Sequence, residues 1–288
     1  MRTTRITAAA LALTAALASA CGGSTSDPAP QTVAIDFKAL VGNVPFSCAD
    51  TAGYAIGTGT LPWIPKDFRF YVSNVRLVDS TGAEAPVTLD PSAWQGYGVA
   101  LLDFENGAGN CTGGTVETNK VVLGTVAPGT YVGLKFDVAV PVASNHLNVQ
   151  AANPPLANSA MYWSWTSGYK FMKIDGLVNR ATPFTFNFHL GSTGCTLATP
   201  GDFSTASCTT LNAPTAAFAS FNATTQAVAL DLALLFADTN FDTADGGGAP
   251  GCMSGATDPE CAPIFPQLGL PFGATPAGTQ SSFRVVAK

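Results

Sequence analysis

Short runs in which apolar and polar residues alternate recur along most of this chain. The clearest lie at 33–40, 68–78 and 184–190, where apolar side chains fall at nearly every second position. A period of two is typical of strands with one buried face. Further strands are expected at 87–89, 98–104, 119–126, 131–140 and 282–286, whereas 227–236 fits a strand or a short helix. No long amphipathic helix is visible, so the pattern predicts an all-β protein.

The residues between these runs support that class. The 288 residues include 29 Gly and 20 Pro, and only 11% of them are charged. Frequent turn residues between short apolar segments are typical of a β-sandwich. Since no internal repeat and no later linker interrupts the chain, we predict one disulfide-pinned, sandwich-like β domain over residues 33–288. The net charge of −6 and the lack of basic patches argue against a nucleic-acid partner.

The beginning of the chain has the features of a targeting segment. Arg2 and Arg5 precede an apolar segment at 6–17, and small residues at 18–20 lead to Cys21. This order of positive, apolar and small residues is typical of a bacterial signal peptide. The small-residue run that ends at Cys21 also resembles a lipobox, in which the cysteine becomes the lipidated N-terminus.

We therefore expect residues 1–20 to be a signal peptide and 21–32 to be a lipidated tether. Ala18 stands where a lipobox usually has leucine, so cleavage by ordinary signal peptidase is the alternative. Both interpretations place the protein in a bacterial cell envelope, periplasmic or as an outer-membrane lipoprotein held to the membrane by its lipid anchor.

Export determines how the remaining cysteines are interpreted. They are Cys48, Cys111, Cys195, Cys208, Cys252 and Cys261. An even number in an oxidising compartment indicates disulfides before it indicates metal ligands. Short loops favour Cys195–Cys208 and Cys252–Cys261, which leaves Cys48 and Cys111 for each other, although the sequence alone does not fix the pairing. If all six are paired, a metal site must use histidine, methionine or a less ordinary ligand.

An aromatic segment at 161–171 contains two of the four tryptophans and two of the six tyrosines. If it is extended, Met161, Trp163 and Trp165 share one face. One interpretation is a core strand that buries large rings. The other is a binding site to which the thioether and the two indoles contribute.

The only two histidines, His146 and His189, lie on either side of the aromatic segment in the sequence. His189 alternates with the apolar residues of 184–190, so it faces away from their side. Neutral imidazole binds copper, zinc, iron or nickel, and a thioether selects Cu(I). An indole N–H has no lone pair, so Trp163 and Trp165 are poor ligands unless they are oxidised.

Catalytic patterns are weak. Ser167-Gly168-Tyr169-Lys170 matches an S-x-x-K motif, but that chemistry requires the serine at the start of a helix. No G-x-S-x-G motif is present, and two histidines offer little for general-base networks. We therefore do not expect an enzyme. The alternative to a metal site is a metal-free, adhesin-like envelope module whose aromatic segment stacks on a glycan or another partner.

Seven segments together resemble one known family. They are Phe46–Cys48, Asp67–Val72, Gly98–Phe104, Asn145-His146, Met161–Trp165 with Gly168–Phe171, Phe188–Cys195 and Gly251–Gly255. These segments are similar to the MbnP-like family, the exported metallo-mystery pair proteins with a four-cysteine motif. The resemblance extends over most of the chain, and its W-x-W-x-x-G-Y-K-F block is specific.

The resemblance implies a copper-binding protein whose partner is a di-haem enzyme of the MbnH type, related to cytochrome c peroxidases and MauG. In this family the partner oxidises a tryptophan to kynurenine, and copper binding depends on that change. Opening the indole creates a ketone oxygen and an aniline nitrogen, both with lone pairs. By the resemblance, Trp163 or Trp165 is the modified residue, His146 and His189 are copper ligands, and Met161 is a lesser candidate.

Overall fold

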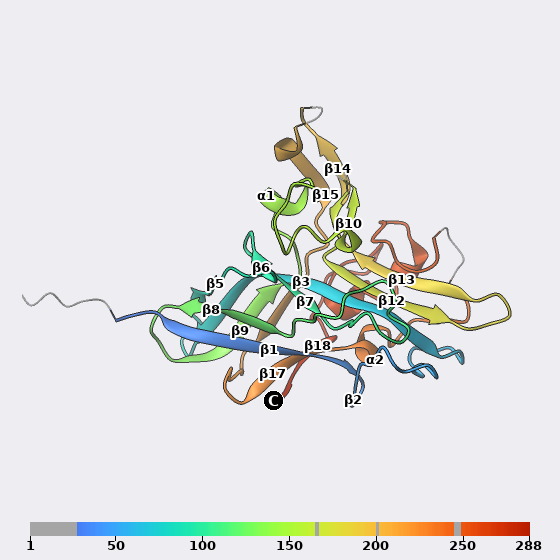
Figure 1. Ribbon diagram of the computed structural model, residues 1–288, viewed down its shortest axis with the longest axis horizontal. Coiled ribbons are helices and arrows are strands. Elements are labelled where there is room, and N and C mark those ends of the chain that lie inside the picture. Colours follow the sequence, from blue (N-terminus) through green and yellow to red (C-terminus); the bar gives the residue numbers. More distant parts are fainter. Residues whose placement is uncertain (1–27, 165–166, 200–201, 245–248) are drawn as a thin grey trace, which may run out of the picture.

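The computed structural model describes residues 28–164, 167–199, 202–244 and 249–288. Two β-sheets pack against each other there, and two small hairpins lie outside them (Figure 1). The prediction of an all-β, sandwich-like fold is confirmed. The predicted signal peptide, Cys21 and Trp165 lie outside the described residues. Within the described ranges, no helix is long and apolar enough to cross a membrane.

The larger sheet has eight strands and contains the longest one, β3. Its strands are β3 (Trp63–Asp79), β4 (Glu84–Pro86), β6 (Gln95–Gly96), β7 (Val99–Asp103), β9 (Tyr131–Asp137), β12 (Met172–Val178), β13 (Phe184–Leu190) and β16 (Thr215–Phe218). The central order is β13-β12-β3-β7-β6, and all of these pairings are antiparallel. Strands β4 and β9 pair with β3, and β16 pairs with β9.

The smaller sheet has six strands in the order β18-β17-β1-β8-β5, with β2 attached to β1. They are β1 (Gln31–Val41), β2 (Val44–Pro45), β5 (Thr88–Leu89), β8 (Val121–Val126), β17 (Gln226–Asp231) and β18 (Phe283–Ala287). Strand β1 pairs parallel with β17 and antiparallel with β8. Strand β1 begins at Gln31, so it includes the last two residues of the predicted tether, 21–32.

The core between the sheets follows from the alternation along their strands. In β1, Ile35 and Phe37 point inward and are at most 3% exposed. The ring of Phe37 lies 6.1 Å from Phe70 of β3 and 5.4 Å from Phe136 of β9, and both of these rings also contact Phe283 of β18. Edge-to-face pairs of this kind stabilise by about 0.5–1.5 kcal/mol beyond burial of their area. The four rings therefore join the two sheets.

Short helices and two hairpins connect the strands, and α2 packs against β1 and β17 of the smaller sheet. The helices are α1 (Val142–Asn145), α2 (Leu232–Leu235), η1 (Ser159–Met161), η2 (Phe203–Thr205), η3 (Pro259–Cys261) and η4 (Phe265–Leu268). The hairpins are β10 (Tyr162–Ser164) with β11 (Gly168–Tyr169), and β14 (Thr193–Leu197) with β15 (Ala206–Thr210). Figure 1 shows α1, β10, β14 and β15 on the side of the larger sheet away from β1 and β17.

The aromatic segment differs from the extended strand considered above. Met161 ends the helical turn η1, Trp163 lies in β10, and the chain has reversed direction by β11. A glycine with φ of +78°, Gly168, begins β11, and a backbone in this region favours glycine. An extended segment with Met161 and Trp163 on a common face is therefore wrong. The segment forms a short hairpin over the larger sheet.

All three predicted disulfides are present: Cys48–Cys111, Cys195–Cys208 and Cys252–Cys261. Cys195 and Cys208 lie directly opposite each other in the β14–β15 hairpin. The segment at 227–236 contains both expected structures, because β17 ends at Asp231 and α2 follows at once. The Asp231 carboxylate accepts a hydrogen bond from Ala233 N and caps this turn.

Candidate metal centre

Ionisable side chains form a row across the outer face of the larger sheet. Strand register aligns Asp103 of β7 with Arg69 of β3, Arg69 with Lys173 of β12, and Lys173 with His189 of β13. Arg69, Asp103 and His189 are buried, with exposed fractions of 3%, 1% and 8%. Buried charges are stable only when they are paired and hydrogen-bonded. The ionised members of this row therefore depend on partners.

Two carboxylates pair with the row. Asp67 of β3 forms ion pairs with both Arg69 and Lys173. Asp175 of β12 accepts a hydrogen bond from Lys173 Nζ at 2.6 Å and faces the His189 ring at 2.9 Å. Lys173 thus bridges the two carboxylates, and Asp175 joins Lys173 to His189.

The contact with Asp175 determines which nitrogen of His189 is free. A carboxylate only accepts hydrogen bonds, so Nε2 of His189 carries the proton and donates to Asp175 Oδ1. Burial lowers the pKa of His189, although Asp175 opposes this effect. Burial also disfavours the charge on Asp175, but His189 and Lys173 outweigh it and hold the pKa of Asp175 below its usual value. The result is a neutral imidazole whose Nδ1 lone pair is available to a metal ion.

Trp163 lies beside this imidazole. The ring centroids of Trp163 and His189 are 6.2 Å apart, with 55° between the planes. The indole also lies against Gly191, where a Cβ would approach Trp163 Cζ3 to 2.5 Å and Tyr169 O to 2.9 Å. A side chain at position 191 would displace the indole, so glycine at this position allows Trp163 to approach the end of β13.

A cavity of about 510 Å³ opens beside the indole. Its wall is formed by Trp163, Ser167, Ser192, Thr193, Gly194, Cys195, Ala249 and Met253. These residues come from the β10–β11 hairpin, the start of β14 and the segment before η3. The cavity is therefore formed where three chain segments meet above the outer face of the larger sheet.

His146 reaches the same region from α1. It is 3% exposed, and its Nε2 lies 3.4 Å from Cys208 Sγ and 3.2 Å from Asn145 Nδ2. Asn145 Oδ1 also accepts a hydrogen bond from Tyr169 N, which fixes the end of α1 to the β10–β11 hairpin. Cys208 is bonded to Cys195, which lines the cavity beside Trp163. One disulfide thus connects His146 to the cavity wall.

The predicted site residues therefore occupy different environments. His189 and Trp163 are in ring contact, and His146 lies at the disulfide that borders their cavity. Met161 is fully buried in the hydrophobic core, whereas Trp165 lies outside the described residues. His146, Cys195 and Cys208 also have their ligand atoms within 4.8 Å of one another, but both sulfurs are used in the disulfide.

Sequence reasoning missed the polar residues that support this centre. Asp175 and Lys173 alternate with apolar residues in β12, and this alternation was the available signal. Lys170, which was considered only as part of an S-x-x-K motif, donates from Nζ to Ala160 O at 2.8 Å. Burial, assisted by the charge of Lys173, lowers the pKa of Lys170 to about 8.

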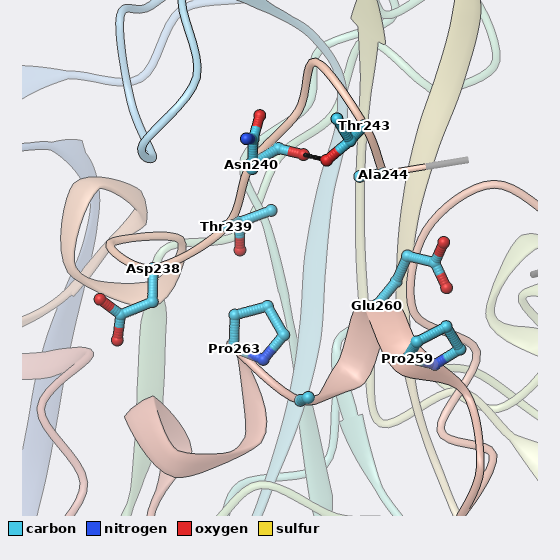
Figure 2. A pocket seen from close by; sticks show the side chains of 9 residues that line it. Asp238, Thr239, Asn240, Thr243, Ala244, Pro259, Glu260 and Pro263 are labelled. Carbon is cyan, nitrogen blue, oxygen red and sulfur yellow. Dashed lines mark hydrogen bonds between the residues drawn. The ribbon is translucent and has the colours of Figure 1, made fainter. Parts of the chain in front are cut away.

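A second pocket, of about 610 Å³, lies at 238–244 and 259–263. Figure 2 shows the carboxylates of Asp238 and Glu260 at opposite ends of this pocket, pointing apart. Asp238 accepts a hydrogen bond from Gln267 Nε2, and Asp242 accepts hydrogen bonds from the backbone N–H groups of Thr60 and Leu61. These carboxylates do not converge on one point, so the pocket lacks the arrangement of a cation site.

The chain was compared with known proteins. A family model described as MbnP matches residues 30–254. Among solved structures, MbnP from Methylosinus trichosporium matches with a TM-score of 0.80 and 33% sequence identity, covering 90% of this chain and 99% of that one. No curated protein matches the chain. The family match includes the segments that carry His146, Trp163 and His189.

Proposed function

The chain belongs to the MbnP family, and on this premise we propose that it is an exported copper-binding protein. Copper is held by His146, His189 and a kynurenine formed from Trp163 or Trp165. The chain is then a substrate of a di-haem oxidising partner of the MbnH type rather than an enzyme. The single observation that carries the proposal is the contact of Trp163 with a histidine whose Nε2 is held by Asp175.

The donor set fits copper in chemical terms. His189 offers Nδ1, because Nε2 donates to Asp175. A carboxylate bound to the second nitrogen of a ligating histidine is the usual support for a metal-bound imidazole and raises its basicity. The cysteines in the described ranges are paired in disulfides, so no thiolate competes for the ion. Imidazole, aniline and ketone donors suit copper better than they suit calcium or magnesium.

The chain's own residues also prepare Trp163 for modification. Its side chain is half-buried and lines an open cavity, so an oxidant or a partner's surface can reach the indole. Gly191 leaves the space that the indole occupies on its other side. Conversion to kynurenine would require the di-haem partner to draw oxidising equivalents from dioxygen or a peroxide and to cleave the Cγ–Cδ1 double bond of the indole into a ketone and an N-formyl group. Hydrolysis of that group releases the carbon as formate and leaves an aniline and a ketone beside His189. A ring with no lone pair to donate then becomes a ligand.

The cellular setting is part of the proposal. Residues 1–20 direct export, and Cys21 carries the lipid that anchors the protein in the bacterial envelope. The partner enzyme acts in the same compartment. The three disulfides support an oxidising location.

The test is the mass of the peptide that contains residues 161–170, taken from protein produced together with its di-haem partner. A mass change equal to tryptophan-to-kynurenine conversion, assigned to one residue by fragmentation, is the expected result. Copper per chain is measured on the same sample and on His146→Ala and His189→Ala variants, both of which should lose copper. Two unmodified tryptophans, or normal copper in both variants, would overturn the proposal in favour of a metal-free binding module.

A further inference from the structure

One of the three disulfides is more accessible than the other two. The cysteines of the two buried disulfides are at most 4% exposed, namely Cys48, Cys111, Cys252 and Cys261. Cys195 and Cys208 are both half-buried, and Cys195 lines the open cavity beside Trp163. Thiol–disulfide exchange requires an attacking thiolate to reach a sulfur atom. A dithiol reductant therefore reaches the Cys195–Cys208 bond more easily than either buried bond.

The β14–β15 hairpin that carries this bond stands outside both sheets (Figure 1). Its two cysteines lie directly opposite each other, on the less exposed face of the hairpin. Two hydrogen bonds hold the base of the hairpin independently of the disulfide. Ser192 Oγ donates to Leu211 O at 3.2 Å. Asn212 Nδ2 donates to Gly191 O at 2.8 Å. Reduction would therefore leave the two sulfurs near each other and the sandwich intact.

A histidine faces this disulfide from α1. His146 Nε2 lies 3.4 Å from Cys208 Sγ, and the ligand atoms of His146, Cys195 and Cys208 all lie within 4.8 Å of one another. Asn145 Oδ1 accepts from Tyr169 N, so the amide presents Nδ2 to His146 Nε2 at 3.2 Å. Since Nδ2 is a donor, Nε2 carries the lone pair and the ring proton lies on Nδ1. The nitrogen beside the sulfur can therefore bind a metal ion that replaces the amide as its partner.

Two thiolates and one imidazole are a donor set typical of zinc, which is redox-inactive and does not reoxidise its ligands. Bonds of about 2.3 Å to sulfur and about 2.0–2.1 Å to nitrogen place these two atoms about 3.5 Å apart at tetrahedral angles. The observed separation of His146 Nε2 and Cys208 Sγ, 3.4 Å, is close to that value. Two thiolate ligands require about 3.8 Å between their sulfurs, and cleavage of the S–S bond allows it. The cavity beside Cys195 has room for water as a fourth ligand.

A second group of ligand atoms in the described residues lacks these features. Cys252, Asp258 and Cys261 also lie close together, but both cysteines are fully buried. Asp258 already accepts hydrogen bonds from Met253 N at 2.7 Å and from Glu260 N at 3.2 Å. Burial keeps a reductant away from that disulfide, so the same chemistry is not expected there.

We propose that a dithiol reductant opens the Cys195–Cys208 disulfide and that the two thiolates and His146 Nε2 then bind one zinc(II) ion. The reductant supplies two electrons and two protons: its own sulfurs form a disulfide, and Cys195 and Cys208 become thiols. Zinc releases both thiol protons to the solvent when it binds. The zinc site shares His146 with the copper site proposed above, but it does not require a modified tryptophan. Reduction of one hairpin thus makes zinc a competitor of copper for His146.

The test uses full chain produced without an oxidising partner, so that its tryptophans are unmodified. Cys21→Ser in every sample removes the cysteine outside the three disulfides. Limited treatment with dithiothreitol, followed by alkylation and peptide mass analysis, should label Cys195 and Cys208 before the other four cysteines. The reduced chain, freed of dithiothreitol without air, is titrated with zinc(II) against a chromophoric chelator. We expect one zinc per reduced chain and no zinc taken from the chelator by the oxidised chain.

Variants identify the ligands. His146→Gln should weaken zinc binding at least about tenfold, and joint replacement of Cys195 and Cys208 by serine should abolish it. His189→Gln is the matched control, because it changes the other histidine and should leave zinc binding unchanged. The same variant should lose copper when it is made with the di-haem partner. Normal copper there would count against the copper function alone.

A spectrum of the reduced wild type needs no variant to fold. Cadmium(II), added as a zinc substitute, should produce a thiolate-to-metal charge-transfer band in the ultraviolet. A missing cadmium band, no zinc in the reduced chain, or zinc binding that His146→Gln leaves unchanged would overturn the zinc site. Earlier labelling of a buried disulfide would overturn the selective reduction of Cys195–Cys208.

Discussion

Replacement of Asp175 by asparagine tests how the larger sheet prepares His189. The amide has the same shape as the carboxylate, but it removes the charge that faces His189 Nε2 at 2.9 Å. A hydrogen bond to a charged group contributes about 1.5–3 kcal/mol and a neutral one about 0.5–1.5, so the change removes about 1–1.5 kcal/mol. Since 1.4 kcal/mol corresponds to a factor of ten, copper affinity should fall about tenfold.

The assay is competition for copper with a chelator of known affinity, performed on Asp175→Asn, His189→Ala and the double variant. Because Asp175 is argued to act through His189, it should have no further effect once His189 is gone. Asp231→Asn is the matched control, since Asp231 is likewise a buried carboxylate with a basic partner, here Arg284, but lies in the smaller sheet. Normal affinity in Asp175→Asn, or an equal loss in the His189→Ala background, would refute the reasoning.

Three further predictions concern packing, pH and disulfide stability. Gly191→Ala should displace Trp163, destabilise by about 1–3 kcal/mol and alter the near-ultraviolet circular dichroism; an unchanged tryptophan signal would contradict it. Burial raises the pKa of Asp103 to about 8, so the native state binds more protons than the unfolded state between about pH 4 and pH 8, and stability falls as pH rises. Asp103→Asn should flatten that slope in urea unfolding at pH 5 and pH 8, and an unaltered slope would count against it. Replacing Cys48 and Cys111 by alanine opens a crosslink with a sequence separation of 63. The free energy of unfolding, measured in urea at fixed pH, should fall by about 4 kcal/mol. A decrease below about 1 kcal/mol would show that the crosslink constrains the unfolded chain little.

The strands whose apolar and polar residues alternate could be predicted from the sequence. Alternation located β13 at 184–190 and most of β1 and β3, because one face of each strand is buried against the other sheet. Short loops favoured two of the disulfides, Cys195–Cys208 and Cys252–Cys261, and left Cys48 and Cys111 for each other, and the structure confirms all three pairs. The class and the larger elements were therefore predictable from residues that are close together in the chain.

The conformation of the aromatic segment was harder to predict, because the same run of aromatic residues fits either one extended strand or a hairpin. Aromatic residues such as Trp163 and Tyr169 are common in strands, so the segment was read as one strand. In the structure the two residues lie on opposite strands of a hairpin. Strand β12 was also missed, since Gly176 interrupts its apolar face. That glycine leaves room for the Trp63 indole, whose Cε2 would lie 2.0 Å from a Cβ. Such a requirement comes from a distant strand and is not visible in the local pattern.

The centre itself depends on contacts between distant segments. His189 was correctly expected to face away from the apolar side of its strand, but its partner Asp175 is determined by the pairing of β12 with β13. The proximity of His146 to Cys208 likewise depends on where the β14–β15 hairpin lies. Residue types could suggest ligands, whereas the supporting carboxylate could be identified only from the three-dimensional arrangement.

The buried charged row has a consequence for how the chain finds its fold. Side chains alternate between the two faces of a strand, so a slip of one residue in β3, β7, β12 or β13 would move Arg69, Asp103, Lys173 or His189 into the sandwich core. Such a slip would also leave the partners on the other strands unpaired, and an unpaired buried charge costs about 3–5 kcal/mol. Misaligned sheets are thereby disfavoured at four adjacent strands at once. The polar residues that support the metal centre thus also help to specify the strand register, because they penalise a slip of one residue.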